Sequence, residues 1–88
     1  MNIEFTPNGW EDYLFWYKND HAVLDKVNDL IQEITRDPFK GIGKPEALRG
    51  NLAGYWSRRI TGEHRLVYRV HGTKSHQTLT IVKTRFHY

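Results

Sequence analysis

Apolar side chains in the first half of the chain recur at the spacing of a helix. Over residues 7–20 they are Trp10 and the residues three, four and seven positions after it, Tyr13, Leu14 and Tyr17. Thr6-Pro7, just before them, is typical of a helix N-cap followed by proline in the first turn. The pattern predicts an amphipathic helix that ends near residues 19–20. We interpret its aromatic residues as core rather than as a stacking platform of Tyr13, Trp16 and Tyr17.

A second apolar stripe predicts a second helix directly after the first. Its residues are Val23, Leu24, Val27, Leu30, Ile31 and Ile34. Asp37-Pro38 ends this helix, because proline disfavours helical conformation in the residue before it.

The remaining segments read as strands and turns. Residues 2–5 alternate between polar and apolar, and strands are expected at 55–60, 64–70 and 78–86. The segments 61–63 and 72–75 supply hairpin turns, and the glycine-rich segment 39–50 is expected to be a loop. The order β-α-α-β-β-β predicts one α+β domain over residues 1–88. It would have a small, antiparallel-rich sheet, with two helices on one face and the other face free.

Strand periodicity suggests which side chains meet on the free face. Over residues 64–70, Leu66, Tyr68 and Val70 would share one face, and Arg65, Val67 and Arg69 the other. Lys83, Arg85 and His87 would share a side if the last strand stays extended. Arg65 and His87 would then converge on the uncovered face, with Glu46 on a loop at its rim.

Charge divides the chain into two halves. Residues 1–43 hold four Lys/Arg against eight Asp/Glu, and residues 44–88 hold nine against two. The two halves therefore carry net charges of −4 and +7, which suggests a polyanionic partner for the second half; a solvated basic surface is the alternative.

The absence of cysteine favours a reducing compartment. With no membrane-spanning run and no signal peptide, we expect a cytoplasmic protein without a membrane partner.

The polar residues of the second half could cleave an RNA phosphodiester. Transesterification needs a base for the 2′-hydroxyl, cations for the charge that builds on phosphorus, and an acid for the leaving 5′ oxygen. Glu46 suits the base, and Arg65 and Arg59 offer planar donor pairs for phosphoryl oxygens. His87 suits the acid, because histidine holds and releases a proton near neutral pH. No side chain suggests itself as a nucleophile, and neither metal nor cofactor is expected.

Several nearby residues also have simpler interpretations. Arg58-Arg59 could protect an edge strand against aggregation. We interpret His64 as a partly buried, hydrogen-bonded histidine. His71 and His76 flank a turn and could bind a metal, but we expect no nearby carboxylate to complete a site. The segment 41–44 fails as a phosphate-binding loop, since Pro38 and Pro45 stand where its motif needs glycine and Ser/Thr.

Four motifs in order resemble the YoeB (Txe/YoeB) toxins of the RelE superfamily, from bacterial type II toxin–antitoxin systems. They are Gly43-Lys44-Pro45-Glu46-x-Leu48, Gly54-x-Trp56-Ser57-Arg58-Arg59-Ile60, His64-Arg65-Leu66-Val67-Tyr68 and Arg85-x-His87-Tyr88. Trp10-x-Asp12-Tyr13 and Asp37-Pro38-Phe39 extend the resemblance over essentially the whole chain.

The resemblance implies a fold like that of small microbial ribonucleases and a ribosome-dependent mRNA endoribonuclease activity. It assigns the base to Glu46, the acid to His87 and transition-state stabilisation to Arg65, with Arg59 and Tyr88 assisting. Lys44, Arg49 and Arg85 would supply further basic groups for substrate binding. It also implies a YefM-type antitoxin and homodimerisation of the toxin. The alternatives are a toxin of the same fold that poisons gyrase by binding, and a nucleic-acid-binding module that does not cleave.

Overall fold

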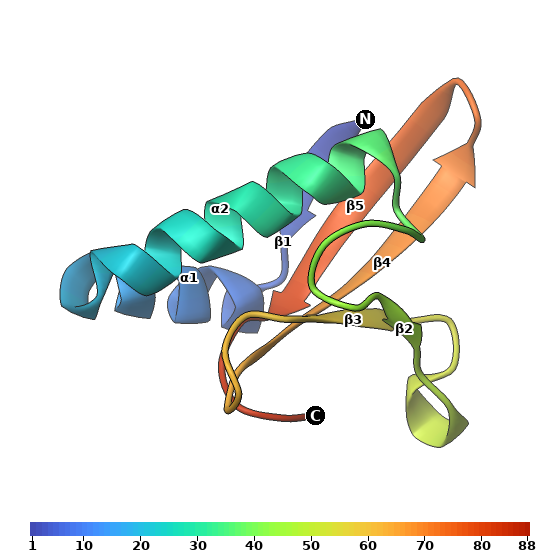
Figure 1. The fold of residues 1–88 in the computed structure, drawn as a ribbon. Helices are drawn as coiled ribbons and strands as arrows, with labels where there is room; N and C mark the ends of the chain where they lie inside the picture. The colour runs from blue at the N-terminus through green and yellow to red at the C-terminus, as the bar shows by residue number, and fades with distance from the viewer.

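The computed structural model describes residues 1–88 and contains two helices and a five-stranded sheet (Figure 1). The elements in chain order are β1 (Asn2–Phe5), α1 (Pro7–Asn19), α2 (His21–Arg36), β2 (Glu46–Ala47), the short 3-10 helix η1 (Gly50–Leu52), β3 (Trp56–Arg59), β4 (Arg65–Thr73) and β5 (His76–Lys83). The strands lie in the order β1-β5-β4-β3-β2. The pair β1–β5 is parallel and the other pairs are antiparallel. The predicted α+β class is therefore confirmed.

Three details of the strand predictions were wrong. The predicted loop 39–50 contains β2, a two-residue strand that carries Glu46 and pairs with β3. The last hairpin is longer than predicted, because β4 runs to Thr73 and β5 begins at His76. The last strand also ends at Lys83 rather than at Phe86.

Both helices begin and end where the local sequence indicates. Thr6 caps α1 by accepting a hydrogen bond from the Gly9 amide (3.0 Å), and proline occupies the first turn. Asp20 caps α2 by accepting from the Val23 amide (3.2 Å). Asp37, which precedes Pro38, terminates α2.

The predicted face of α2 is confirmed, whereas that of α1 holds only at Tyr13, which packs against the core. Val27, Leu30, Ile31 and Ile34 of α2 are buried against the sheet. In α1, Trp10 and Tyr17 are 48% and 57% exposed, and the buried aromatic residue is Trp16 (5% exposed).

Close contact with β5 explains the orientation of α1. A Cβ atom on Gly9 would overlap the backbone of Ile81, so glycine lets the helix lie directly on the strand. The face that contacts the sheet then contains Asp12 and Trp16. The Asp12 carboxylate accepts from the Thr84 amide (3.0 Å), and the Trp16 indole donates to the Thr84 carbonyl (3.0 Å). Hydrogen bonds to the segment after β5, rather than apolar spacing, therefore select the buried face of α1.

The alternation predicted for β4 holds only in part. Leu66 and Tyr68 are fully buried, as expected for the core face. Val67, expected on the free face, is also buried (2% exposed), and the register with β5 shifts between Val67 and Tyr68.

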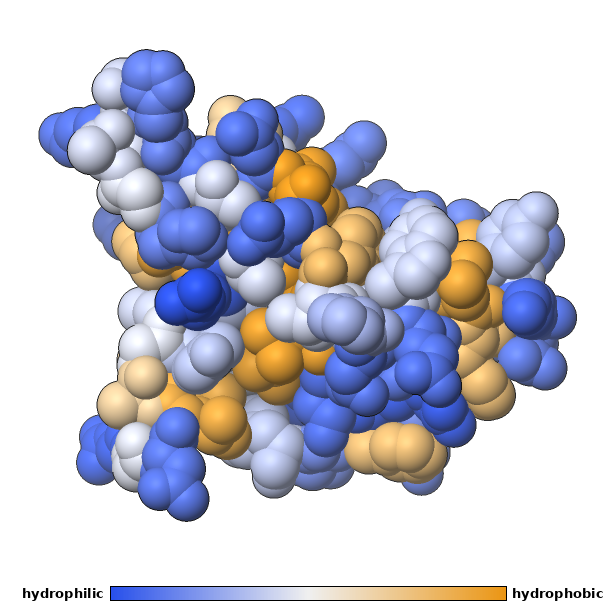
Figure 2. Space-filling model, turned by 180° about the vertical axis from the view of Figure 1, so that it is seen from behind, coloured by the Kyte–Doolittle hydropathy of each residue, from blue (hydrophilic) through white to orange (hydrophobic).

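Seen from behind, apolar residues form separate patches among polar ones (Figure 2). Neither helix is long and apolar enough to cross a membrane.

Candidate functional site

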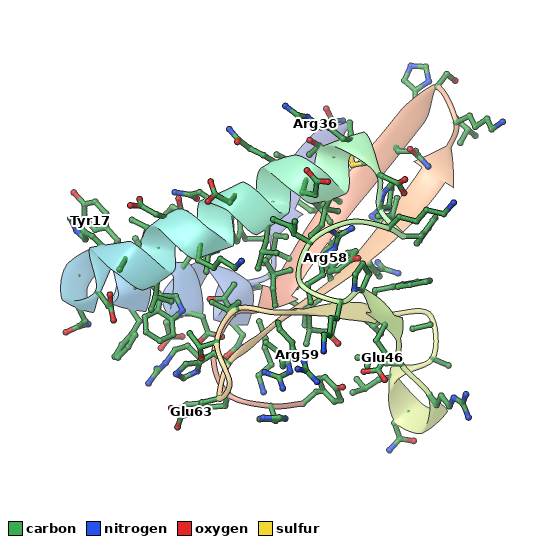
Figure 3. All side chains as sticks on the ribbon, in the orientation of Figure 1. Tyr17, Arg36, Glu46, Arg58, Arg59 and Glu63 are labelled. Carbon is green, nitrogen blue, oxygen red and sulfur yellow. The ribbon has the colours of Figure 1, made fainter.

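A cavity of about 350 Å³ lies where β2, β3 and the start of β4 meet the C-terminal segment. Its lining residues are mostly polar or charged: Lys44, Pro45, Glu46, Ser57, Arg59, Arg65, His87 and Tyr88. Six of the eight residues selected from the sequence therefore come together here. Figure 3 shows Glu46 and Arg59 on the side of the sheet past which the C-terminal segment runs.

Glu46 enters the cavity from the edge strand β2. The segment before it turns through Gly43 and Lys44, which have φ values of 83° and 51°. The Gly43 carbonyl accepts a hydrogen bond from the Arg59 amide (2.7 Å), which ties this turn to β3. The Glu46 carboxylate in turn accepts from the Tyr88 hydroxyl (3.2 Å). That bond joins β2 directly to the C-terminal segment.

Arg59 and Arg65 face each other across β3 and β4 as register partners. The Arg65 guanidinium donates to the carbonyls of Thr61 (2.8 Å) and His64 (3.0 Å), so the turn between the strands holds it in place. The two histidine–carboxylate contacts in the structure, His64–Glu63 and His71–Glu4, involve no cation of the cavity. The positive charges in the cavity are therefore available to an anion.

His87 and Tyr88 reach the cavity through a turn at Phe86, which has a φ of 60°. Both backbone groups of Phe86 are held. Its amide donates to His64 Nδ1 (2.8 Å), and its carbonyl accepts from the Arg65 amide (3.1 Å). Lys83 Nζ donates to the His87 carbonyl (2.7 Å).

Arg85 and Arg49 lie outside this cavity. The guanidinium of Arg85 stacks 3.6 Å from the centre of the Phe15 ring, beside a separate cavity against α1. Lys83, Arg85 and His87 were expected to share a side if the last strand stays extended. That condition is not met, because β5 ends at Lys83 and Phe86 turns the chain. Arg49 is exposed immediately before η1.

Arg58 is a residue whose role the sequence reasoning missed. It is fully buried and therefore does not protect an edge strand. Its guanidinium donates to the carbonyls of Asp37 (2.7 Å), Lys40 (2.8 Å) and Ile42 (3.1 Å) and to the Tyr68 hydroxyl (3.2 Å). Arg58 thereby shapes the loop that leads to Glu46, and Figure 3 shows it against that loop. Strand alternation was the available signal: if Arg59 faces outward, Arg58 faces inward.

The histidines outside the cavity differ in their surroundings. The His64 side chain is 13% exposed and hydrogen-bonded, which confirms its interpretation. His71, contrary to expectation, does have a carboxylate nearby: its Nε2 lies 3.5 Å from Glu4 Oε1. No group of three or more His, Asp or Glu side chains is arranged to hold a metal ion.

Two titrating groups are perturbed, and both lie outside the cavity. The hydrogen bond from Thr80, followed by the proximity of His71, lowers the pKa of Glu4. Burial raises the pKa of Tyr68, and the guanidinium of Arg58 partly opposes that rise.

Two helices packed on a five-stranded mixed sheet define the fold of the RelE-like toxins. The family model for the YoeB-like toxin of bacterial type II toxin–antitoxin systems matches residues 5–88, and the chain belongs to this family. It is 53% identical to Toxin YoeB of Streptomyces coelicolor, over 100% of both chains.

Solved structures agree with this assignment. The YoeB/ParE toxin from Agrobacterium tumefaciens matches with a TM-score of 0.96 and 52% identity, over 100% of both chains. A heterotetrameric YoeB–YefM toxin–antitoxin complex from Staphylococcus aureus matches with a TM-score of 0.87 and 44% identity, over 100% of this chain and 98% of that one. The YoeB dimer from the same organism matches with a TM-score of 0.88, at the same identity and coverage.

Proposed function

We propose that this toxin is a metal-independent mRNA endoribonuclease that acts on the ribosome and thereby inhibits translation. The observation that carries the proposal is the convergence of Glu46, Arg65 and His87 from three separate segments on one cavity. Each has the chemistry of one part of phosphodiester transesterification. The cavity also contains the hydroxyl residues Ser57 and Tyr88, but Ser57 is only 3% exposed and the Tyr88 hydroxyl is bonded to Glu46.

The substrate therefore supplies the nucleophile. Glu46 takes the proton of the 2′-hydroxyl, and the 2′ oxygen attacks the adjacent phosphorus to form a cyclic phosphate. The bond from phosphorus to the 5′ oxygen breaks, and protonated His87 gives its proton to that oxygen. Arg65 and Arg59 stabilise the additional charge on the phosphoryl oxygens, since their guanidinium groups stay charged and have no carboxylate partner.

Tyr88 contributes where the C-terminal segment meets β2. Its hydroxyl holds Glu46 in the free protein, and its half-exposed ring can stack on an unstacked base of a single-stranded message. Lys44 adds a further charge at the rim.

Dependence on the ribosome is supported by the openness of the site. Glu46, His87 and Tyr88 are exposed, so the protein alone encloses little of the RNA. In-line attack needs close control of the scissile sugar and phosphate. A message held in the ribosome would arrive with that geometry restricted, and the +7 charge of residues 44–88 would favour docking on ribosomal RNA. We place this activity in the cytoplasm, where ribosomes work.

We further propose that a YefM-type antitoxin neutralises the toxin and that the toxin forms a homodimer, as the S. aureus relatives do. An acidic antitoxin segment laid over Arg59 and Arg65 would cover the unpaired charges of the cavity.

Glu46→Gln and His87→Gln test the proposed function in a translation extract. Each should lower the rate of mRNA cleavage by about 10²–10⁴-fold with the fold intact. Glu11→Gln and His76→Gln, at exposed positions outside the cavity, serve as matched controls and should cleave normally. A message with a single 2′-deoxy sugar at the cut site should resist. Normal cleavage by the Glu46 or His87 variant would refute the assignment, and stalled translation without cut mRNA would indicate inhibition by binding.

A further inference from the structure

We propose that His64 is a positioning residue whose neutral imidazole fixes the turn at Phe86 and thereby directs His87 and Tyr88 into the cavity. This inference rests on the proposed function, since it explains how the acid of that reaction is placed. His64 does not line the cavity, and it acts through the backbone of the C-terminal segment.

The C-terminal segment needs such a contact because it has left the sheet. Beyond Lys83 no strand ladder holds the chain. The amide and carbonyl of Phe86 bind instead to two consecutive residues, His64 through its side chain (2.8 Å) and Arg65 through its backbone (3.1 Å). The same short stretch of chain therefore carries the proposed phosphate-binding guanidinium and fixes the approach of the acid.

The backbone at Phe86 needs contacts from its surroundings to hold its shape. Its φ of 60° lies in the left-handed region, which residues other than glycine adopt at an energetic cost. Such a conformation persists where the surroundings hold it. Without the bond to His64, the chain would relax toward ordinary φ values, and His87 would swing away from Glu46 and Arg65.

The bond defines the protonation state of His64. A backbone amide can only donate, so Nδ1 must be an acceptor and carries no proton. The ring proton lies on Nε2, on the side where Glu63 Oε1 stands 3.5 Å away. A charged imidazolium would turn an N–H toward the Phe86 amide and break the contact.

Packing fixes the orientation of the ring. The indole of Trp16 meets it edge to face, with centroids 4.8 Å apart and planes at 77°. Trp16 is itself anchored by its hydrogen bond to the Thr84 carbonyl (3.0 Å). The contacts thus run from the buried face of α1, through Trp16 and His64, to the residue that precedes His87.

Two substitutions separate this role from general packing. In His64→Asn the side-chain oxygen can take the place of Nδ1, whereas in His64→Gln the amide group lies closer to the position of Nε2. Both lose the ring that contacts Trp16. We expect His64→Gln to lower the maximal cleavage rate at saturating ribosomes by about 10²-fold, the loss typical of a misplaced catalytic group, without weakening ribosome binding. His64→Asn should recover most of that rate.

Two measurements do not depend on cleavage. Amide hydrogen exchange at Phe86, and release of Tyr88 by a carboxypeptidase, should both be faster in His64→Gln than in the wild type or in His64→Asn. In the wild-type protein, imidazole ¹⁵N shifts should identify His64 as neutral with its proton on Nε2, which tests the contact even if a variant fails to fold.

The outcomes distinguish this inference from the proposed function. A proton on Nδ1 in the wild type, unchanged Phe86 exchange in His64→Gln, or equal loss of cleavage in both variants would overturn the role of His64 and leave the proposed function standing. Unimpaired cleavage by Glu46→Gln and His87→Gln would overturn the proposed function, while exchange at Phe86 would still report whether His64 holds the segment.

Discussion

Replacing Tyr68 by phenylalanine removes a single oxygen atom from a fully buried polar cluster that Tyr68 forms with Arg58. The Tyr68 side chain is fully buried; its hydroxyl donates to the Pro38 carbonyl (2.6 Å) and accepts from Arg58 Nε (3.2 Å). A neutral hydrogen bond contributes about 1 kcal/mol, and one to a charged group about 1.5–3 kcal/mol. Because Arg58 is also fully buried, water cannot readily replace the lost partner. The free energy of unfolding should therefore fall by about 2.5–4 kcal/mol.

Urea denaturation followed by circular dichroism measures this loss. For a domain of this size, stability is roughly 4–13 kcal/mol, so the variant should unfold at a clearly lower urea concentration with an unchanged slope. Its melting temperature should fall by about 10–30 °C. Tyr17→Phe is the matched control, since Tyr17 is exposed, and it should stay within about 0.5 kcal/mol of the wild type. A similarly small change for Tyr68→Phe would refute the idea that this hydroxyl and Arg58 hold the loop.

The pH dependence gives a second check on Tyr68. Burial raises the pKa of its hydroxyl above the value in the unfolded chain, which is about 10. The neutral phenol is thus favoured in the folded state, so its contribution is fully present below about pH 10 and is lost as the pH rises through the folded-state value. The difference in stability between the wild type and Tyr68→Phe should shrink in that alkaline range.

Three further predictions concern other parts of the molecule. Thr80→Val removes the main cause of the low pKa of Glu4, so NMR titration should show that pKa rising toward its ordinary value. Because the folded-state pKa is lowered, Glu4 stabilises the fold above its unfolded-state pKa, and this contribution is lost as the pH falls. The contribution should be smaller in Thr80→Val. Gly9→Ala should destabilise the fold by about 1–3 kcal/mol because its Cβ would displace α1 from β5, whereas Gly62→Ala, in open space, should cost far less by the same urea assay. Affinity for the proposed YefM-type antitoxin should fall about tenfold or more between 0.1 and 0.5 M salt in titration calorimetry. A double Ala substitution of Arg59 and Arg65 that leaves this affinity unchanged would show that inhibition works elsewhere.

Features set by neighbouring residues were predictable from the sequence. Thr6-Pro7 and Asp37-Pro38 act on the backbone within one turn of the helix, so the helix boundaries followed from local chemistry. The stripe of α2 was predictable for a similar reason, since apolar packing alone decides its buried face.

Features set by distant partners were not predictable in this way. The exposure of Trp10 and burial of Trp16 follow from the fit of Gly9 against Ile81 and the hydrogen bonds to Thr84, which lie more than 60 residues away along the chain. The path of the C-terminal segment was missed because the prediction extended β5 past Lys83. Nothing in the residues after Lys83 signals a left-handed turn at Phe86.

Neighbouring residues on β3 and at the start of β4 divide the work of building the proposed site. Glu46 follows a left-handed turn at Lys44, and His87 follows one at Phe86. Arg58 holds the loop before the first turn, and His64 holds the second. The next residue in each case, Arg59 after Arg58 and Arg65 after His64, lines the cavity. The Arg59 amide donates to the Gly43 carbonyl, and the Arg65 amide donates to the Phe86 carbonyl. Each arginine is thus bonded to the segment that its neighbour holds. The Arg59 and Arg65 guanidinium groups are therefore each carried by the residue that follows the one positioning the proposed base or acid. A substitution at Arg58 or His64 should consequently displace one proposed catalytic group while leaving the opposite segment in place.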